Sequence, residues 1–185
     1  MARDGKRAEG TRILWAELTG GGSLSGATYF IEQTKQEEFF MKCYEGTGLG
    51  RVLVLELKRG EKIVESVEAA LKERGIRNAY VASSVGSVQL MKSHRPTSLA
   101  EVTEDEFLTE QDPFELGGIS GTVIDGVAHL HFSMASPNQV QCGHLEYGCE
   151  VLYLVEITVV EILGLNLERR MTPEKVKRLF VKGEE

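Results

Sequence analysis

The segment from Phe114 to Ala135 constrains the fold most, because it contains two strand-like runs joined by Asp125-Gly126. An Asp-Gly pair between two apolar runs is typical of a tight hairpin turn. In the second run, His129 and His131 alternate with apolar residues, so both imidazoles share one face of a strand. The sequence therefore predicts an antiparallel hairpin that presents two neighbouring histidines.

One stretch changes to helical spacing and ends at Gly75, where a C-terminal cap belongs; its apolar residues are Ile63, Val64, Val67, Ala70 and Leu71. A strand over Asn78–Leu90, bent at Ser83–Ser87, follows it, and Val151–Leu163 reads as a long strand with both faces largely buried. We predict an α/β (α+β) domain with a mostly antiparallel sheet and one principal packed helix.

The two ends of the chain carry additional elements. Strands are expected at Ile13–Leu18, Thr28–Ile31 and Glu38–Tyr44, the last pairing as a hairpin with Arg51–Leu57. Thr172-Pro173-Glu174 has the residues of a helix start and predicts a C-terminal helix. The predicted divisions are an arm with extra strands over 1–50, the domain over 51–163 and a helical extension over 164–185.

Composition limits the classes of function. The 185 residues carry a net charge of -7, which disfavours a surface built to neutralise phosphates. Seven acidic residues between Glu101 and Glu115 predict a solvated loop. The odd set Cys43, Cys142 and Cys149 has no CxxC pair, which favours free thiols and a cytoplasmic location. No apolar run approaches the ~20 residues of a spanning helix, so no membrane partner is expected.

Three histidines form the leading candidate site. His129 and His131 are neighbours, and the turn-rich Ser136–Gln139 returns the chain so that His144 lies beside them. Neutral imidazoles at this spacing suit a divalent ion, zinc first, and three protein ligands leave its fourth position open. The alternative is a pair of exposed strand histidines without a ligand.

Other candidates have weaker signals. Glu156 interrupts an apolar strand, as a base or a hydrogen-bond partner of the site would, or as a solvated edge residue. Cys142 is either a soft ligand or a small buried thiol. His94 lies in Ser-His-Arg-Pro without a ligand nearby in sequence and is assigned to the surface.

An ordered set of motifs resembles the plant- and prokaryote-conserved (PPC) domain over about Arg51–Leu163. The motifs are RGEKI, GIRNAYVASSVGSVQL, FELGGISGTVIDG, HLHFSMA, CGHLEYG and LVEITVVEI. The resemblance implies assembly as a homotrimer and a structural relation to acetolactate decarboxylase-like proteins, whose three histidines hold zinc. It assigns those positions to His129, His131 and His144, and the acidic position of the last strand to Glu156.

The resemblance also has departures. Cys142 stands where the family usually has glycine, which places a side chain beside His144. Plant members carry AT-hooks that grip the minor groove, but this chain has no Arg-Gly-Arg-Pro core, so DNA binding is doubtful.

Three hypotheses remain open. The first is a trimeric metal site that binds or transforms a small molecule, as a lyase or hydrolase in which Glu156 moves the proton. The second is a DNA-binding or transcription-associated interaction module, supported by the basic C-terminal residues Arg169, Arg170, Lys175, Lys177, Arg178 and Lys182. The third is a purely structural metal.

Overall fold

The protein is described by a computed structural model that covers residues 41–184. From Lys42 onward the described chain forms one compact unit. Its elements are β1 (Gly48–Lys58), α2 (Ile63–Glu73), β2 (Ala79–Pro96), β3 (Asp105–Ile124), β4 (Val127–Ala135), β5 (Val140–Leu145), β6 (Glu150–Leu163), β7 (Leu167–Met171) and β8 (Lys177–Val181). This α+β architecture, an antiparallel sheet with one packed helix, confirms the predicted fold class.

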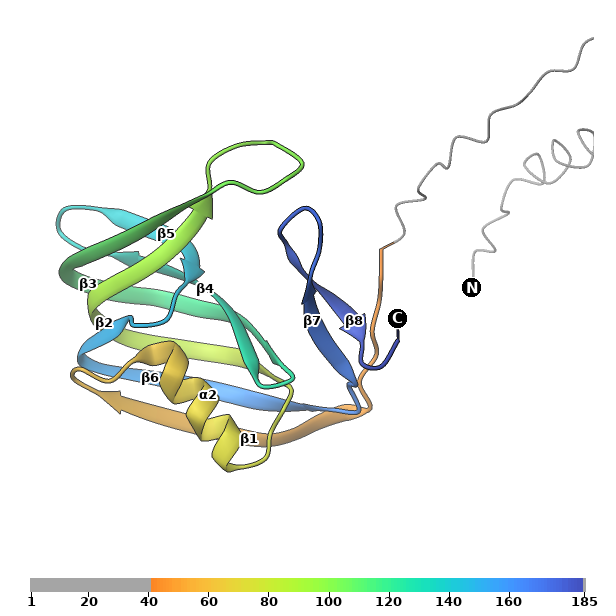
Figure 1. Cartoon of the computed structure of the whole chain (residues 1–185). Helices are drawn as coiled ribbons and strands as arrows, with labels where there is room; N and C mark the ends of the chain where they lie inside the picture. The colour runs from red at the N-terminus through yellow and green to blue at the C-terminus, as the bar shows by residue number, and fades with distance from the viewer. Residues whose placement is uncertain (1–40, 185) are drawn as a thin grey trace, which may run out of the picture. The chain divides into compact units, whose positions relative to one another are not determined.

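Six strands form one sheet in the order β1-β6-β2-β3-β4-β5, and every pairing is antiparallel (Figure 1). One edge of β2 is shared: its first part pairs with β6, and Ser93-His94 near its end pairs with His144-Leu145 of β5. That second pairing closes β2, β3, β4 and β5 into a ring. The closure joins segments fifty residues apart in sequence and positions the candidate site.

The helix α2 covers one face of the sheet and buries four of the five apolar residues that its spacing predicted, Ile63, Val64, Val67 and Leu71, while Ala70 is half-buried. Gly75 has a φ of 67° and donates to the carbonyl of Lys72, which ends the helix as expected. The core beneath it includes Val155, Ile157 and Val159 of β6 together with Leu130, Phe132 and Met134 of β4.

The turn between β3 and β4 confirms the hairpin prediction. Asp125 and Gly126 both have positive φ, at 54° and 81°, as a tight two-residue turn requires. The strands on either side end and begin at Ile124 and Val127, which the sequence pattern placed correctly.

The predicted C-terminal helix is wrong, because β7 and β8 form a hairpin there (Figure 1). Lys175 donates its N–H to the carbonyl of Thr172 at 2.9 Å, the bond of a four-residue turn. A proline in second place suits that turn as well as it suits the first turn of a helix. The Thr-Pro-Glu signal was therefore ambiguous, and pairing with Leu167–Met171 decided it.

Three further predictions differ from the structure. The acidic segment is mostly strand, since β3 begins at Asp105. Residues 41–44 of the predicted N-terminal hairpin are not in a strand, and β1 pairs with β6 instead. The outer face of β6 is not buried, because Leu154 and Glu156 are exposed. The strands expected at Ile13–Leu18 and Thr28–Ile31 lie outside the described residues, and the predicted divisions of the chain stay predictions.

Candidate metal centre

Strand register aligns three histidines in a row across the ring. His131 of β4 lies opposite His144 of β5, and His144 lies opposite His94 of β2. His129 lies two residues before His131, on the same face of β4. Because the apolar residues between them are buried in the core, the four imidazoles project to the outside of the ring.

The first group, His129, His131 and His144, has one ring nitrogen from each residue within 4.8 Å of the others. The Nε2 atoms of His129 and His131 are 3.2 Å apart. Two nitrogens each bound at ~2.0–2.1 Å to a tetrahedral zinc lie about 3.3 Å from one another. The donor set and its spacing therefore fit a zinc ion.

The environment keeps these imidazoles neutral. Burial, followed by the positive charge of His94, lowers the pKa of His144 to about 4. Burial and the nearby charge of Arg169 lower the pKa of His129, and burial lowers that of His131. Metal ligation needs the neutral form of histidine, so the site is in the ligand form at neutral pH.

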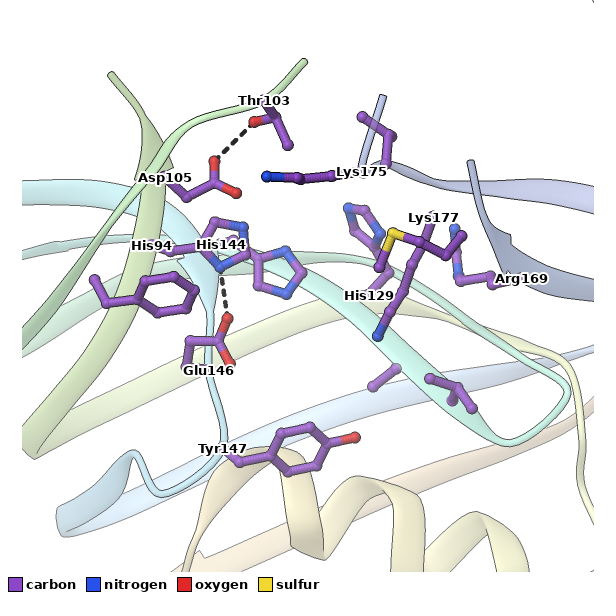
Figure 2. A pocket seen from close by; sticks show the side chains of 15 residues that line it. His94, Thr103, Asp105, His129, His144, Glu146, Tyr147, Arg169, Lys175 and Lys177 are labelled. Carbon is purple, nitrogen blue, oxygen red and sulfur yellow. Dashed lines mark hydrogen bonds and ion pairs between the residues drawn. The ribbon is translucent and has the colours of Figure 1, made fainter. Parts of the chain in front are cut away.

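A second group shares His144. His94, His144 and Glu146 also place one donor atom each within 4.8 Å. His94 Nδ1 lies 2.5 Å from Glu146 Oε1, and the rings of His94 and His144 stack with centroids 4.3 Å apart (Figure 2). The assignment of His94 to an isolated surface position is therefore wrong. Only the pairing of β2 with β5 reveals this contact, and no local sequence signal does.

Glu156 lies away from the histidine groups. It pairs in register with Glu56 of β1 and Val85 of β2, and its side chain is on the exposed face of β6. Val85 and His94 are nine residues apart on β2, up to roughly 30 Å along a strand. Within one chain Glu156 does not join the histidines, so its role as a base stays a prediction that needs a neighbouring subunit.

Cys142 is exposed on β5 and belongs to neither group of donors. The prediction that Cys142 is a small buried thiol is thus wrong, and Cys142 does not add a fourth ligand to the histidines. Cys149 is the buried thiol of the core, where its Sγ donates to the carbonyl of Lys92.

A cavity of about 490 Å³ lies beside His129 and His144. The sheet forms one wall and the β7–β8 hairpin the other, as the labelled side chains in Figure 2 show. Tyr147 lines the cavity and donates its hydroxyl to Glu68 of α2 at 2.8 Å. Burial and this bond raise the pKa of Tyr147 to about 12, so its proton is retained.

The sequence comparison decides the family. The model of the Plants and Prokaryotes Conserved (PCC) domain, also abbreviated PPC, matches residues 44–163. The chain belongs to this family. The PCC domain thus spans β1 to β6 with the four histidines, while the β7–β8 hairpin lies beyond it. No curated protein matches the chain significantly.

Solved structures agree with the PCC fold. A metal-containing protein from Archaeoglobus fulgidus is 25% identical with a TM-score of 0.65, covering 77% of this chain and 100% of that one. A PPC protein from Pyrococcus horikoshii is 23% identical with a TM-score of 0.65, covering 74% and 95%. A candidate DNA-binding protein from Bacteroides thetaiotaomicron is 17% identical with a TM-score of 0.62, covering 75% and 98%.

Within residues 41–184, no helix has the length and apolar character needed to cross a bilayer.

Proposed function

We propose that this PCC-domain protein binds a divalent metal ion, zinc first, through His129, His131 and His144. The observation that carries the proposal is the convergence of their three ring nitrogens within 4.8 Å. The metal-containing relative from Archaeoglobus fulgidus supports it. When bound, the ion would supply a Lewis acid with an open coordination position beside the cavity.

The experiment is metal analysis of the native protein, followed by the His129→Ala/His131→Ala variant. We expect about one zinc per chain in the native protein and its loss from the variant. Cys142→Ser is the matched control, because Cys142 is exposed on β5, belongs to neither group of donors and should leave the zinc content unchanged. A folded native protein without metal, or a double variant that keeps its zinc, would sink the proposal.

The proposal includes a small-molecule site, which a structural metal alone would not provide. The cavity beside His129 and His144 supports this choice, because a concave space next to an open coordination position suits a ligand. Reaction as a metal-dependent lyase or hydrolase remains a prediction. Removal of zinc by a chelator separates the two cases. If the metal takes part in a ligand site, its removal abolishes ligand binding; if the metal is purely structural, its removal only lowers the melting temperature.

The proposed assembly is a homotrimer. Its support in this chain is an exposed apolar face on β1, β2 and β6 formed by Val52, Val54, Val85 and Leu154. Exposed apolar patches of this kind mark protein interfaces. The location we propose is the cytoplasm, since all three cysteines are free thiols.

A second candidate function is DNA binding. The basic hairpin residues Arg169, Lys177 and Arg178 and the description of the Bacteroides relative favour it. The net charge of -7 weighs against it. A salt titration of duplex binding tests it: phosphate contacts predict a steep fall in affinity with salt, and no binding at low salt rejects this candidate.

A further inference from the structure

The cavity beside the histidines is bounded by a part of the chain that lies beyond the family domain. Arg169, Lys175 and Lys177 of the β7–β8 hairpin and its turn line it, facing His129 and His144 of the sheet (Figure 2). Residues 44–163 alone would leave this wall of the cavity open. The hairpin therefore adds to the cavity side chains that the family domain alone does not supply.

Arg169 is the most constrained of these cations. One guanidinium nitrogen donates to Thr122 Oγ1 at 3.0 Å, while Nε is buried without a hydrogen-bond partner among residues 41–184. A half-buried guanidinium with an unused donor is costly, because burial removes water without replacing its hydrogen bonds. A negatively charged ligand in the cavity would balance the charge of this guanidinium.

Two other cations of the hairpin have acidic partners, whereas Arg178 is exposed and lies outside the cavity. Arg170 pairs with Glu168 at 2.6 Å, and Lys182 pairs with Asp125 at 2.9 Å. Arg169, Lys175 and Lys177 take part in no ion pair within the described chain. Three of the four hairpin cations without an ion pair in the described chain therefore line the cavity.

Two acids, Asp105 and Glu146, line the cavity against its three cations. Glu146 is held by His94, while Asp105 accepts a hydrogen bond from the neutral hydroxyl of Thr103 at 3.0 Å and keeps its charge. Arg169 and Lys177 line the cavity together with His129. The side chains beside the candidate metal ligands therefore carry more positive than negative charge.

Part of the remaining lining is apolar and includes Phe107, Val127, Met171 and Val176. Such walls gain nothing from a bare inorganic anion, which prefers water to a hydrocarbon surface. They suit the carbon body of an organic ligand.

We propose that the cavity binds a small organic acid whose carboxylate lies against Arg169 and Lys177. Its carbon body packs along Phe107, Val127 and Met171, and its other end faces His129 and His144. The inference rests on the proposed function, because the end of the ligand that faces His129 and His144 would lie beside the proposed metal ion. It assigns the hairpin the role of selecting an acidic ligand.

The test measures binding of four probes to the zinc-loaded full-length protein by calorimetry or ligand-observed NMR. The probes are butyrate, 2-hydroxybutyrate, the neutral analogue butyramide and inorganic phosphate. We expect both acids to bind more tightly than butyramide and phosphate. Arg169→Gln and Lys177→Gln should each weaken binding of the acids about 10-fold, the effect of losing a charged hydrogen-bond partner.

Arg170→Gln is the matched control, because Arg170 lies on the same strand and is paired with Glu168 outside the cavity. It should change the affinity less than about twofold, because its charge is offset by Glu168 and lies outside the cavity. Thermal melts show that each variant is folded, and Lys177→Gln serves if Arg169→Gln is not. Equal binding of butyrate and butyramide, phosphate binding without acid binding, or identical effects of Arg169→Gln and Arg170→Gln overturns the proposal.

The two proposals fail separately. Zinc content without acid binding removes the organic-acid site and leaves the metal centre. If the protein takes up no zinc but binds butyrate in a manner that depends on Arg169, the metal centre is rejected and the acid site is retained.

Discussion

At the scale of single residues, the metal centre depends on how closely β3 and β4 approach each other. Gly121 has a φ of 131°, a region that L side chains rarely adopt. A methyl group there would overlap the backbone oxygen of His129. The glycine therefore permits β3 to approach β4 closely at His129.

Gly121→Ala should lower the free energy of unfolding by roughly 2–4 kcal/mol, from backbone strain and overpacking together. It should also reduce zinc content, because β4 must shift at the residue that carries a ligand. Thermal unfolding and metal analysis check both effects. Gly118→Ala is the matched control on β3, since a methyl group there meets nothing within 4 Å. Equal effects of the two substitutions would show that the close approach is unimportant.

Residue patterns predicted the parts of the site that are local in sequence. The alternation around His129 and His131 requires only one strand, and the Asp-Gly turn requires only two residues with positive φ. His94 could not be found in this way, because its contact with His144 depends on the closure of β5 onto β2. The residue pattern of a single segment does not reveal which distant segment it pairs with.

At the scale of elements, the ends of the chain show the same limit. The Thr-Pro-Glu triplet satisfies a helix start and a β-turn equally, so the choice depended on a partner strand. The short remaining segment could not hold an isolated helix, which is marginal below ~12–15 residues. Pairing of β7 with β8 satisfied the backbone and turned Arg169 towards the cavity.

An ion pair near the start of the edge strand β1 links it to β6. Arg51 Nε donates to Glu161 Oε2 at 2.8 Å, and the backbone N–H of Arg51 donates to the same oxygen at 3.1 Å. These hydrogen bonds lower the pKa of Glu161 to about 2, from an ordinary value of 4.5. A carboxylate with a lowered pKa stabilises the folded state above its unfolded pKa and loses that effect as pH falls.

Arg51→Gln should therefore lower the melting temperature at pH 7, and the difference from the native protein should shrink between about pH 4.5 and about pH 2. Melts at pH 7, 3.5 and 2 measure this. Arg95→Gln is the control, because its pair with Glu106 is open to water on both sides. A difference that stays constant with pH would assign the effect to packing of the arginine and not to the carboxylate.

At the scale of the whole molecule, no segment within residues 41–184 covers the outer face of β1, β2 and β6. The inner face of β1 and β6 packs against α2, whereas the outer face exposes Val54 by 69% and Val85 by 56%. Glu156 stands on this outer face opposite Glu56, so the two carboxylates repel unless a partner contacts them. A second subunit that covered the face would bury the apolar residues and supply such a contact.

Val54→Glu should convert the proposed trimer into monomers, because a third carboxylate beside Glu56 and Glu156 opposes burial of the face. Light scattering during size-exclusion chromatography should give three chain masses for the native protein and one for the variant. Val140→Glu is the matched control, since Val140 is 80% exposed on β5 and lies off this face. A native monomer, or a Val54→Glu trimer, would contradict the assignment of the face. Loss of trimer with zinc retained would further show that one chain completes its own metal centre, and that Glu156 has no part in holding the ion.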